Sequence, residues 1–216
     1  MQRGSSAPMR CSNTVTCVGA LEVGQLVQEL FTGFMAYTAS SHVLDRPEIA
    51  DATIAALVAS NRGPAAVPIG HILRADGSEI AYDLTHAIRN VRLTSSYRDA
   101  YDRLWLAGAL LALGDRLDDE DYFDRGPELE FVRHLRNGIA HGNKFHFLHG
   151  EPLRPAHFTG PERRLLPGGG ETQPGNVITR EITAALEGEP VLFDFIGAGD
   201  VCDLLMFVSS RLGRMP

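Results

Sequence analysis

The strongest constraint on the fold is an unbroken apolar run of ten residues at positions 104–113. A membrane-spanning helix needs about 20 such residues, so we expect this run to be a buried helical segment of a globular core. Ser96-Tyr97-Arg98-Asp99 has the pattern of a capping box, which predicts a helix over about residues 97–117. Because its middle is apolar on all sides, this helix should be central in the fold.

Apolar residues at helical spacing predict further helices on both sides of this segment. The first covers residues 20–40, and the second begins at the start signal Asp45-Arg46-Pro47 and ends within residues 61–64. A short helix is expected at 80–90. Pro127 opens another, and Gly199-Asp200 opens the last one.

The β-structure expected from the sequence is small. Residues 144–148 have the period-two pattern of a short strand, and 177–183 and 190–196 are expected to pair as a β-hairpin. Residues 65–80 and 150–176 are expected to be irregular. The sequence therefore predicts a mainly α fold, a bundle of four to six helices with a small β-hairpin near the C-terminus.

Composition supports an ordinary globular protein, since 44% of the 216 residues are hydrophobic and 22% are charged. We expect residues 1–18 to be a disordered lead without a secretory signal, and residues 19–216 to form a single domain. The three cysteines are odd in number and form no CxxC pair, which favours a reducing, cytoplasmic location. No membrane partner is expected.

Charge is distributed unevenly along the chain. The net charge of −7 argues against a protein that tracks duplex DNA by neutralising phosphates. Residues 131–150 nevertheless contain no acid but hold two arginines, one lysine and four histidines, and they follow a strongly acidic stretch at 115–130. This pattern indicates either a solvated basic helix face or a local anion site.

The helix opened by Pro127 has one apolar stripe and one polar face. At about 100° per residue the stripe consists of Leu129, Val132, Leu135 and Ile139. Asn137 lies opposite the stripe, His141 follows it one turn later, and Arg136 lies at one edge of the polar face. Arg133 and Lys144 flank this face. We therefore expect Asn137 and His141 to line a shallow cleft that solvent reaches.

Arginine and histidine together suit phosphate chemistry. The guanidinium of Arg136 presents paired N–H donors to phosphate oxygens, and the imidazole of His141 exchanges a proton near neutral pH. Gly142 is the expected C-terminal cap, which places His141 in the last turn. There the helix dipole favours imidazolium while Arg133 and Arg136 oppose it, and the sequence leaves that balance open.

The string Arg136-Asn137-Gly138-Ile139-Ala140-His141 resembles the signature of HEPN domains, which is an arginine, a polar residue, a short spacer and a histidine. Gly142-Asn143-Lys144-Phe145 and Gly199-Asp200-Val201 are similar to a HEPN subfamily found on bacterial plasmids. The apolar helix at 97–117 stands where that fold has its preceding core helix. In order of elements the resemblance covers residues 20–213.

The resemblance implies a helical bundle, often a homodimer, and in many members a metal-independent endoribonuclease of toxin–antitoxin or phage-defence systems. His141 would take the proton of a ribose 2′-hydroxyl, Arg136 would stabilise charge on the phosphate, and Asn137 would orient His141 or the phosphate. RNA contacts are expected from Arg133, His134, Asn143 and Lys144. No metal and no other cofactor is expected, because no acid or thiolate accompanies the histidines at 141–149.

Three other interpretations stay open. Some HEPN proteins have lost catalysis and bind only RNA, a nucleotide or a protein. The chain would then be a scaffold, or the partner of a nucleotidyltransferase or of an antitoxin. In the third, Arg136 and His141 are simply the polar residues of a capped helix end and pair within the fold.

Overall fold

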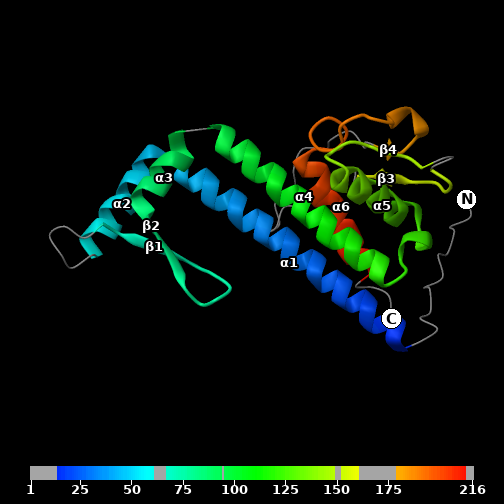
Figure 1. The fold of residues 1–216 in the computed structure, drawn as a ribbon, viewed down its shortest axis with the longest axis horizontal. Coiled ribbons are helices and arrows are strands. Elements are labelled where there is room, and N and C mark those ends of the chain that lie inside the picture. Colours follow the sequence, from blue (N-terminus) through cyan, green and yellow to red (C-terminus); the bar gives the residue numbers. More distant parts are fainter. Residues whose placement is uncertain (1–13, 61–66, 94, 149–151, 161–178, 213–216) are drawn as a thin grey trace, which may run out of the picture. The chain divides into compact units, whose positions relative to one another are not determined.

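The computed structural model describes residues 14–60, 67–93, 95–148, 152–160 and 179–212. Within these residues the chain is mainly helical, with six α-helices and two small two-stranded antiparallel sheets (Figure 1). The chain divides into two compact units. Unit 1 comprises residues up to 32 and from 103 onward, and unit 2 comprises residues 33–102. Helices α1 (Thr14–Leu44) and α4 (Ser95–Asp119) contribute to both units.

Unit 1 is built on four helices, α1, α4, α5 (Pro127–Ala140) and α6 (Ala198–Leu212) (Figure 1). Side-chain bonds join neighbouring helices, from α4 to α1 through Arg116–Glu22, from α6 to α1 through Ser209, and from α6 to α5 through Arg211–Glu128. Each helix also contributes fully buried apolar side chains, among them Val23, Val27, Leu110, Leu113, Leu129, Leu135, Leu204 and Val208. The helix predicted at 97–117 is present as α4, but its apolar run is buried only in part, at Leu106, Ala109, Leu110 and Leu113, while Leu104 is 71% exposed.

The predicted hairpin between 177–183 and 190–196 is wrong. Strand β4 (Thr179–Glu181) pairs with β3 (His157–Thr159), which lies inside the segment expected as a loop. After the short helix η2 (Ala184–Leu186), residues 190–196 fold back on themselves, with Phe193 at a φ of 76° and the Ile196 amide donating to the Val191 carbonyl at 3.0 Å. Val191, Leu192 and Ile196 of this turn are buried, while Phe193 is 42% exposed, so burial of these three side chains in a compact turn replaces strand pairing.

The predicted strand at 144–148 is also absent, since only Lys144 takes part in an isolated bridge, to Pro190. A 3-10 helix, η1 (Phe123–Arg125), breaks the acidic connection between α4 and α5. Most of the predicted loop at 150–176 lies outside the described residues.

Unit 2 contains α2 (Pro47–Ser60), α3 (Leu84–Leu93) and a hairpin of β1 (Ile69–Leu73) with β2 (Glu79–Asp83). Its apolar cluster consists of Ala50, Ile54 and Ile88, with Leu44, Leu57 and Leu84 packed against it. The expectation that 65–80 is irregular is wrong. Gly77, at a φ of 81°, closes a tight turn in which its amide donates to the Arg74 carbonyl at 3.0 Å.

The other helix predictions agree with the structure apart from their ends, except that residues 80–83 of the helix expected at 80–90 belong to strand β2 and α3 covers Leu84–Leu93. Helix α1 extends beyond the predicted 20–40 in both directions, so residues 14–18 of the expected lead are helical, and the rest of that lead lies outside the described residues. Among the described helices, none combines the length and the apolar content that crossing a membrane requires.

Candidate functional site

Helix α5 begins and ends where its sequence dictates. Pro127 occupies the first turn, where a missing amide hydrogen costs nothing, and two glutamates there complement the helix dipole. His141 is the C-terminal cap residue, and Gly142 follows at a φ of 82°, a left-handed conformation that glycine adopts without strain. The helix therefore ends at a left-handed glycine as predicted, but the C-cap residue is His141, which follows the last helical residue, Ala140, instead of lying inside the last turn.

The apolar stripe of α5 is buried as predicted at Leu129, Val132 and Leu135, while Ile139 is partly exposed. Burial extends further around the helix than the stripe requires. Phe131, His134 and Gly138 are buried as well, and a Cβ at Gly138 would meet the Val191 side chain at 2.5 Å. The solvent-reachable part of α5 is therefore narrow and lies toward its C-terminal end, where Asn137 is half-buried and His141 is exposed.

Arg136 is held by residues of α4. Its Nε and one terminal nitrogen donate to Asp115 Oδ1 at 2.8 and 2.5 Å, and the other terminal nitrogen donates to Asn137 Oδ1 at 3.2 Å. The stem of Arg136 crosses α4 at Gly114, where a Cβ would meet Arg136 Cγ at 2.4 Å. A guanidinium has five N–H donors. These contacts use three of them, so among the described residues two donors remain for another acceptor. The arginine side chain is 33% exposed.

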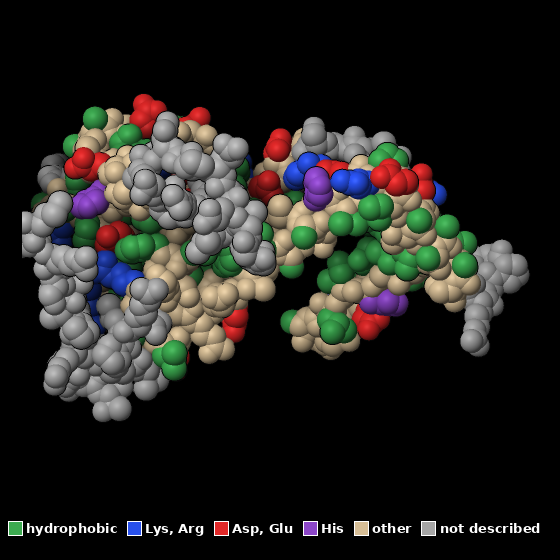
Figure 2. Space-filling model, turned by 180° about the vertical axis from the view of Figure 1, so that it is seen from behind, with side chains coloured by type: hydrophobic (Ala, Val, Ile, Leu, Met, Phe, Trp, Pro, Cys, Tyr) green, Lys and Arg blue, Asp and Glu red, His purple; other side chains and the backbone are tan. Residues whose placement is uncertain are grey.

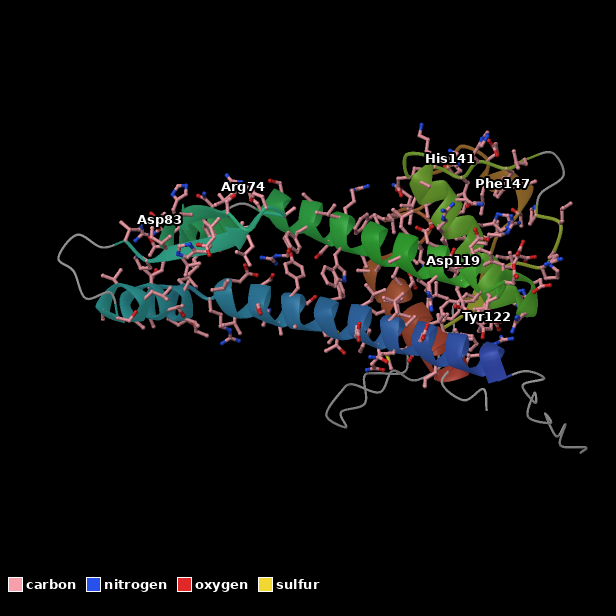
Figure 3. All side chains as sticks on the ribbon, turned by 60° about the horizontal axis from the view of Figure 1, so that its bottom comes forward. Arg74, Asp83, Asp119, Tyr122, His141 and Phe147 are labelled. Atoms are coloured by element: carbon pink, nitrogen blue, oxygen red, sulfur yellow. The ribbon has the colours of Figure 1, made fainter. Side chains whose placement is uncertain are left out.

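His141 projects from the end of α5 with an exposed side chain (Figure 3). Its backbone amide donates to the Asn137 carbonyl at 3.0 Å. Its ring lies against the ring of His146, with centroids 5.5 Å apart and planes at 62°. The His146 Nδ1 in turn lies 3.2 Å from a carboxylate oxygen of Glu187. The His141 and His146 rings thus lie together at the surface, and the Glu187 carboxylate lies beside the His146 ring.

Asn143 and Lys144 differ in what they offer. The side-chain oxygen of Asn143 accepts from the Leu192 amide at 2.8 Å, and its main-chain oxygen accepts from the Val191 amide at 3.1 Å. Asn143 therefore anchors the turn at 190–196 to the end of α5. Lys144 donates its backbone amide to the Gly138 carbonyl at 3.0 Å and keeps its side chain in solvent, so only Lys144 has a side chain open to RNA.

The two remaining predicted RNA contacts lie in or beside a buried polar cluster. His134 is 2% exposed, and its ring lies edge-on to Phe147. Its Nε2 is 3.5 Å from Glu130, a carboxylate that is 4% exposed and accepts from Arg133 at 2.6 Å. A buried carboxylate needs such donors because it has lost its water. Because His134 is buried and Arg133 already donates to Glu130, these two side chains are less open to RNA than that of Lys144.

The structure thus bonds Arg136 to Asn137 and places His141 one turn beyond Asn137 at the helix end, and it adds residues that the sequence analysis missed. Gly114 and Asp115 are the important additions, and no local pattern marks them because their partner is 21 positions away. A hollow of about 620 Å³ lies elsewhere, beside η1. Three aspartates outnumber two arginines in its lining, which suits an anion poorly; the lining is Asp118, Asp121, Phe123, Asp124, Arg125 and Arg154.

Comparisons of the chain with protein-family models, with curated proteins and with solved structures found no match. Function must therefore be argued from the residues at the end of α5. Among the described residues, no group of three or more histidine, cysteine or acidic side chains is arranged to hold a metal ion.

Proposed function

We propose that this protein is a metal-independent endoribonuclease of the HEPN type, with a role as a toxin or in phage defence. The observation that carries the proposal is the end of α5, where an exposed imidazole accompanies a guanidinium fixed by Asp115 and Asn137. A fixed guanidinium with unused donors can stabilise charge that develops on a phosphate without reorganising. An exposed imidazole can exchange a proton with substrate near neutral pH.

In the proposed reaction His141 takes the proton of a ribose 2′-hydroxyl. The 2′-oxygen forms a bond to the adjacent phosphorus, the bond from phosphorus to the 5′-oxygen breaks, and the departing oxygen takes up a proton. The products are a 2′,3′-cyclic phosphate end and a 5′-hydroxyl end. Arg136 donates to the non-bridging phosphate oxygens, and Asn137 keeps the guanidinium in place through its 3.2 Å bond.

The active form in this proposal is a homodimer in which both copies of Arg136 and His141 face one cleft. The helix end of a single chain is too open to enclose a phosphate, and two-fold dimers are the commonest oligomers. A mixing experiment tests this arrangement. Chains carrying Arg136→Lys and chains carrying His141→Ala should be inactive alone and should recover cleavage when combined, provided each cleft takes its arginine and histidine from different chains.

The first test of the activity is cleavage of single-stranded RNA by the purified chain in excess chelator. His141→Ala should lower the rate by about 10²–10⁴, the usual effect of losing a general base. Arg136→Lys keeps the charge but loses the fork, so RNA should still bind while cleavage falls. Matched controls are His42→Ala and Arg98→Lys, which alter an exposed histidine and an ion-paired arginine of unit 2 and should leave the rate unchanged.

DNA of the same sequence should survive, because it lacks the attacking hydroxyl. Cleavage of DNA at the rate of RNA would refute the proposed chemistry, as would full activity in both site variants.

One observation favours a second candidate, a non-catalytic HEPN protein that binds RNA, a nucleotide or a protein partner such as an antitoxin or a nucleotidyltransferase. Asp115 already neutralises the charge of Arg136, which reduces its attraction for phosphate. This candidate predicts binding of RNA or nucleotide without any cleavage product under the conditions above. Detection of a cyclic phosphate end that depends on His141 would eliminate it.

A further inference from the structure

The hairpin of unit 2 is exposed along almost its whole length. Apart from Gly70, which is half-buried, every residue of β1 and β2 is exposed. Large apolar side chains are among them, with exposures of 48% at Ile69, 55% at Ile72, 72% at Leu73 and 44% at Ile80. Figure 2 shows hydrophobic side chains at the surface of the hairpin. A two-stranded hairpin is marginal on its own, so exposed apolar strands of this kind call for a partner.

The backbone bonds at the two ends of the hairpin fix which groups of β1 face outward. Leu84 donates to the Pro68 carbonyl at 3.0 Å, and Arg74 donates to the Ser78 carbonyl at 2.7 Å. In an antiparallel ladder hydrogen-bonded pairs alternate with pairs that are not bonded. The backbone amides and carbonyls of the even-numbered residues of β1 therefore point toward β2. The amides and carbonyls of Ile69, His71 and Leu73 therefore point away from β2. No described residue donates to them or accepts from them.

The two free edges of the hairpin differ in what they allow. If β2 paired with a second β2 about a two-fold axis at Ala81, Glu79 would stand opposite the partner's Asp83, and like charges opposite each other destabilise a sheet. Charge of this kind protects edge strands from pairing. On β1 the same operation about His71 places Ile69 opposite the partner's Leu73. The β2 edge is thus guarded by charge, whereas the β1 edge sets apolar side chains opposite each other on both sides of His71, whose imidazole lies 2.7 Å from Glu79 of its own hairpin.

We propose that β1 pairs with β1 of a second copy of this chain, antiparallel and centred on His71, to form a four-stranded sheet in the order β2–β1–β1–β2. Two backbone hydrogen bonds form between Ile69 and the partner's Leu73. Two more form between His71 and the partner's His71. On the opposite face, Gly70 lies beside the partner's Ile72, which joins the apolar Ile72, Ile80 and Tyr82 of both copies into one surface. The contact is isologous, so it closes on itself and builds no filament through this edge.

This interface uses no residue of the α5 site, so it does not depend on the proposed nuclease activity. If the nuclease cleft also forms by association of two chains, two different two-fold contacts exist. The hairpin contact then joins cleft dimers into larger assemblies, and its loss leaves the cleft dimer, so the mass falls without loss of cleavage.

Substitutions at the β1 edge test the interface in the full-length chain. His71→Pro removes an outward amide without breaking the ladder to β2, and Ala81→Pro does the same at the opposite, guarded edge. Leu73→Lys puts a charge into the contact, and Leu104→Lys, at 71% exposure against 72%, is its control outside the hairpin. His71→Pro and Leu73→Lys should each raise the dissociation constant measured by analytical ultracentrifugation at least about tenfold, a change of about 1.4 kcal/mol. Ala81→Pro and Leu104→Lys should not.

Hydrogen exchange measured by NMR gives an independent result. The amides of Ile69, His71 and Leu73 should become protected as the protein concentration rises, while those of Glu79, Ala81 and Asp83 stay unprotected. Equal exchange at the two edges at all concentrations would overturn the proposal. So would an unchanged mass in His71→Pro, or protection of β1 that appears only when a different protein is added.

Discussion

At the scale of single residues, the position of Arg136 depends on a missing side chain. Its stem passes over Gly114 at a distance where a methyl group does not fit, and its head reaches the next residue of α4, Asp115. Asp115 is 57% exposed, so this ion pair adds little to stability. Its effect is to fix the direction of the guanidinium, which is what electrostatic stabilisation of a phosphate requires.

Gly114→Ala should therefore separate activity from stability. The added methyl would lie 2.4 Å from Arg136 Cγ and must displace the side chain, so we expect RNA cleavage to fall at least about tenfold, as small misplacements of positioning groups do. The helix propensity of alanine is more favourable than that of glycine by about 1 kcal/mol, so the melting temperature should not fall together with the cleavage rate. Gly108→Ala is the control, because no described atom outside its chain neighbours and its own helix backbone lies within 4 Å of its Cβ position. Equal cleavage rates in the two variants would exclude a positioning role for the crossing at Gly114.

At the scale of elements, Asp83 decides where β2 ends and α3 begins. Its Oδ1 accepts from the Thr85 hydroxyl at 2.7 Å, the Thr85 amide at 2.9 Å and the His86 amide at 3.0 Å, an N-cap of the usual kind. The Thr85 hydroxyl and the His86 amide hold the pKa of this carboxyl below its ordinary value of 3.8. The ionised form of Asp83 is therefore more favourable in the folded protein than in the unfolded chain.

A carboxyl whose pKa is lowered by folding stabilises the protein above its ordinary pKa of 3.8. This stabilisation disappears as the pH falls through the pKa that the carboxyl has in the folded protein. Asp83→Ala should lower the melting temperature at neutral pH, and the difference from the natural chain should shrink in acid well below 3.8. Asp194→Ala, an exposed acid in the turn at 190–196, controls for general charge effects. A difference between Asp83→Ala and the natural chain that stays constant with pH would show that the cap acts without its charge.

Elements with a strong local period could be predicted, and those that depend on distant partners could not. The apolar stripe of α5 and the glycine that ends the helix are local, and they agree with the structure except that Ile139 is partly exposed. The hairpin of unit 2 was missed although Asp76-Gly77, a strong turn signal, lies between its strands. The strand at 179–181 does alternate, but its partner lies before it in the chain, at 157–159, and no local pattern says so.

The site shows the same limit. Helical periodicity placed Asn137 and His141 on the accessible side of α5, which is where the structure has them. It could not foresee that His134 packs against Phe147 or that Asn143 bonds the turn at 190–196, because both partners follow after the helix has ended.

At the scale of the whole molecule, the charge of −7 limits how RNA can be bound. Arg136 and Lys144 are the accessible cations at the proposed site, so a two-fold pair offers four to the backbone. For single-stranded nucleic acid each neutralised phosphate contributes about −0.7 to the slope of log affinity against log salt, which predicts a slope of about −3 for a dimer and about −1.4 for a single chain.

Fluorescence anisotropy with a labelled RNA over a series of salt concentrations measures this slope, and the His141→Ala chain allows it to be done without cleavage. Lys144→Ala should flatten the slope, while Lys or Arg substitutions in unit 2, such as Arg74→Ala, should not change it. A slope of about −6 or steeper would mean that RNA lies along a broad basic surface and not at the end of α5.

The passage of Arg136 over Gly114 also has a consequence for how this protein can change over evolutionary time. A side chain at position 114 and an arginine at position 136 exclude each other in the present packing, since the Cβ would stand 2.6 Å from that of Arg136. Positions in such contact change together in related chains. Descendants of this sequence that keep the arginine are expected to keep glycine at 114, and those that lose the arginine become free to fill the space. The pair 114 and 136 should therefore serve as a record of which relatives have retained the reaction.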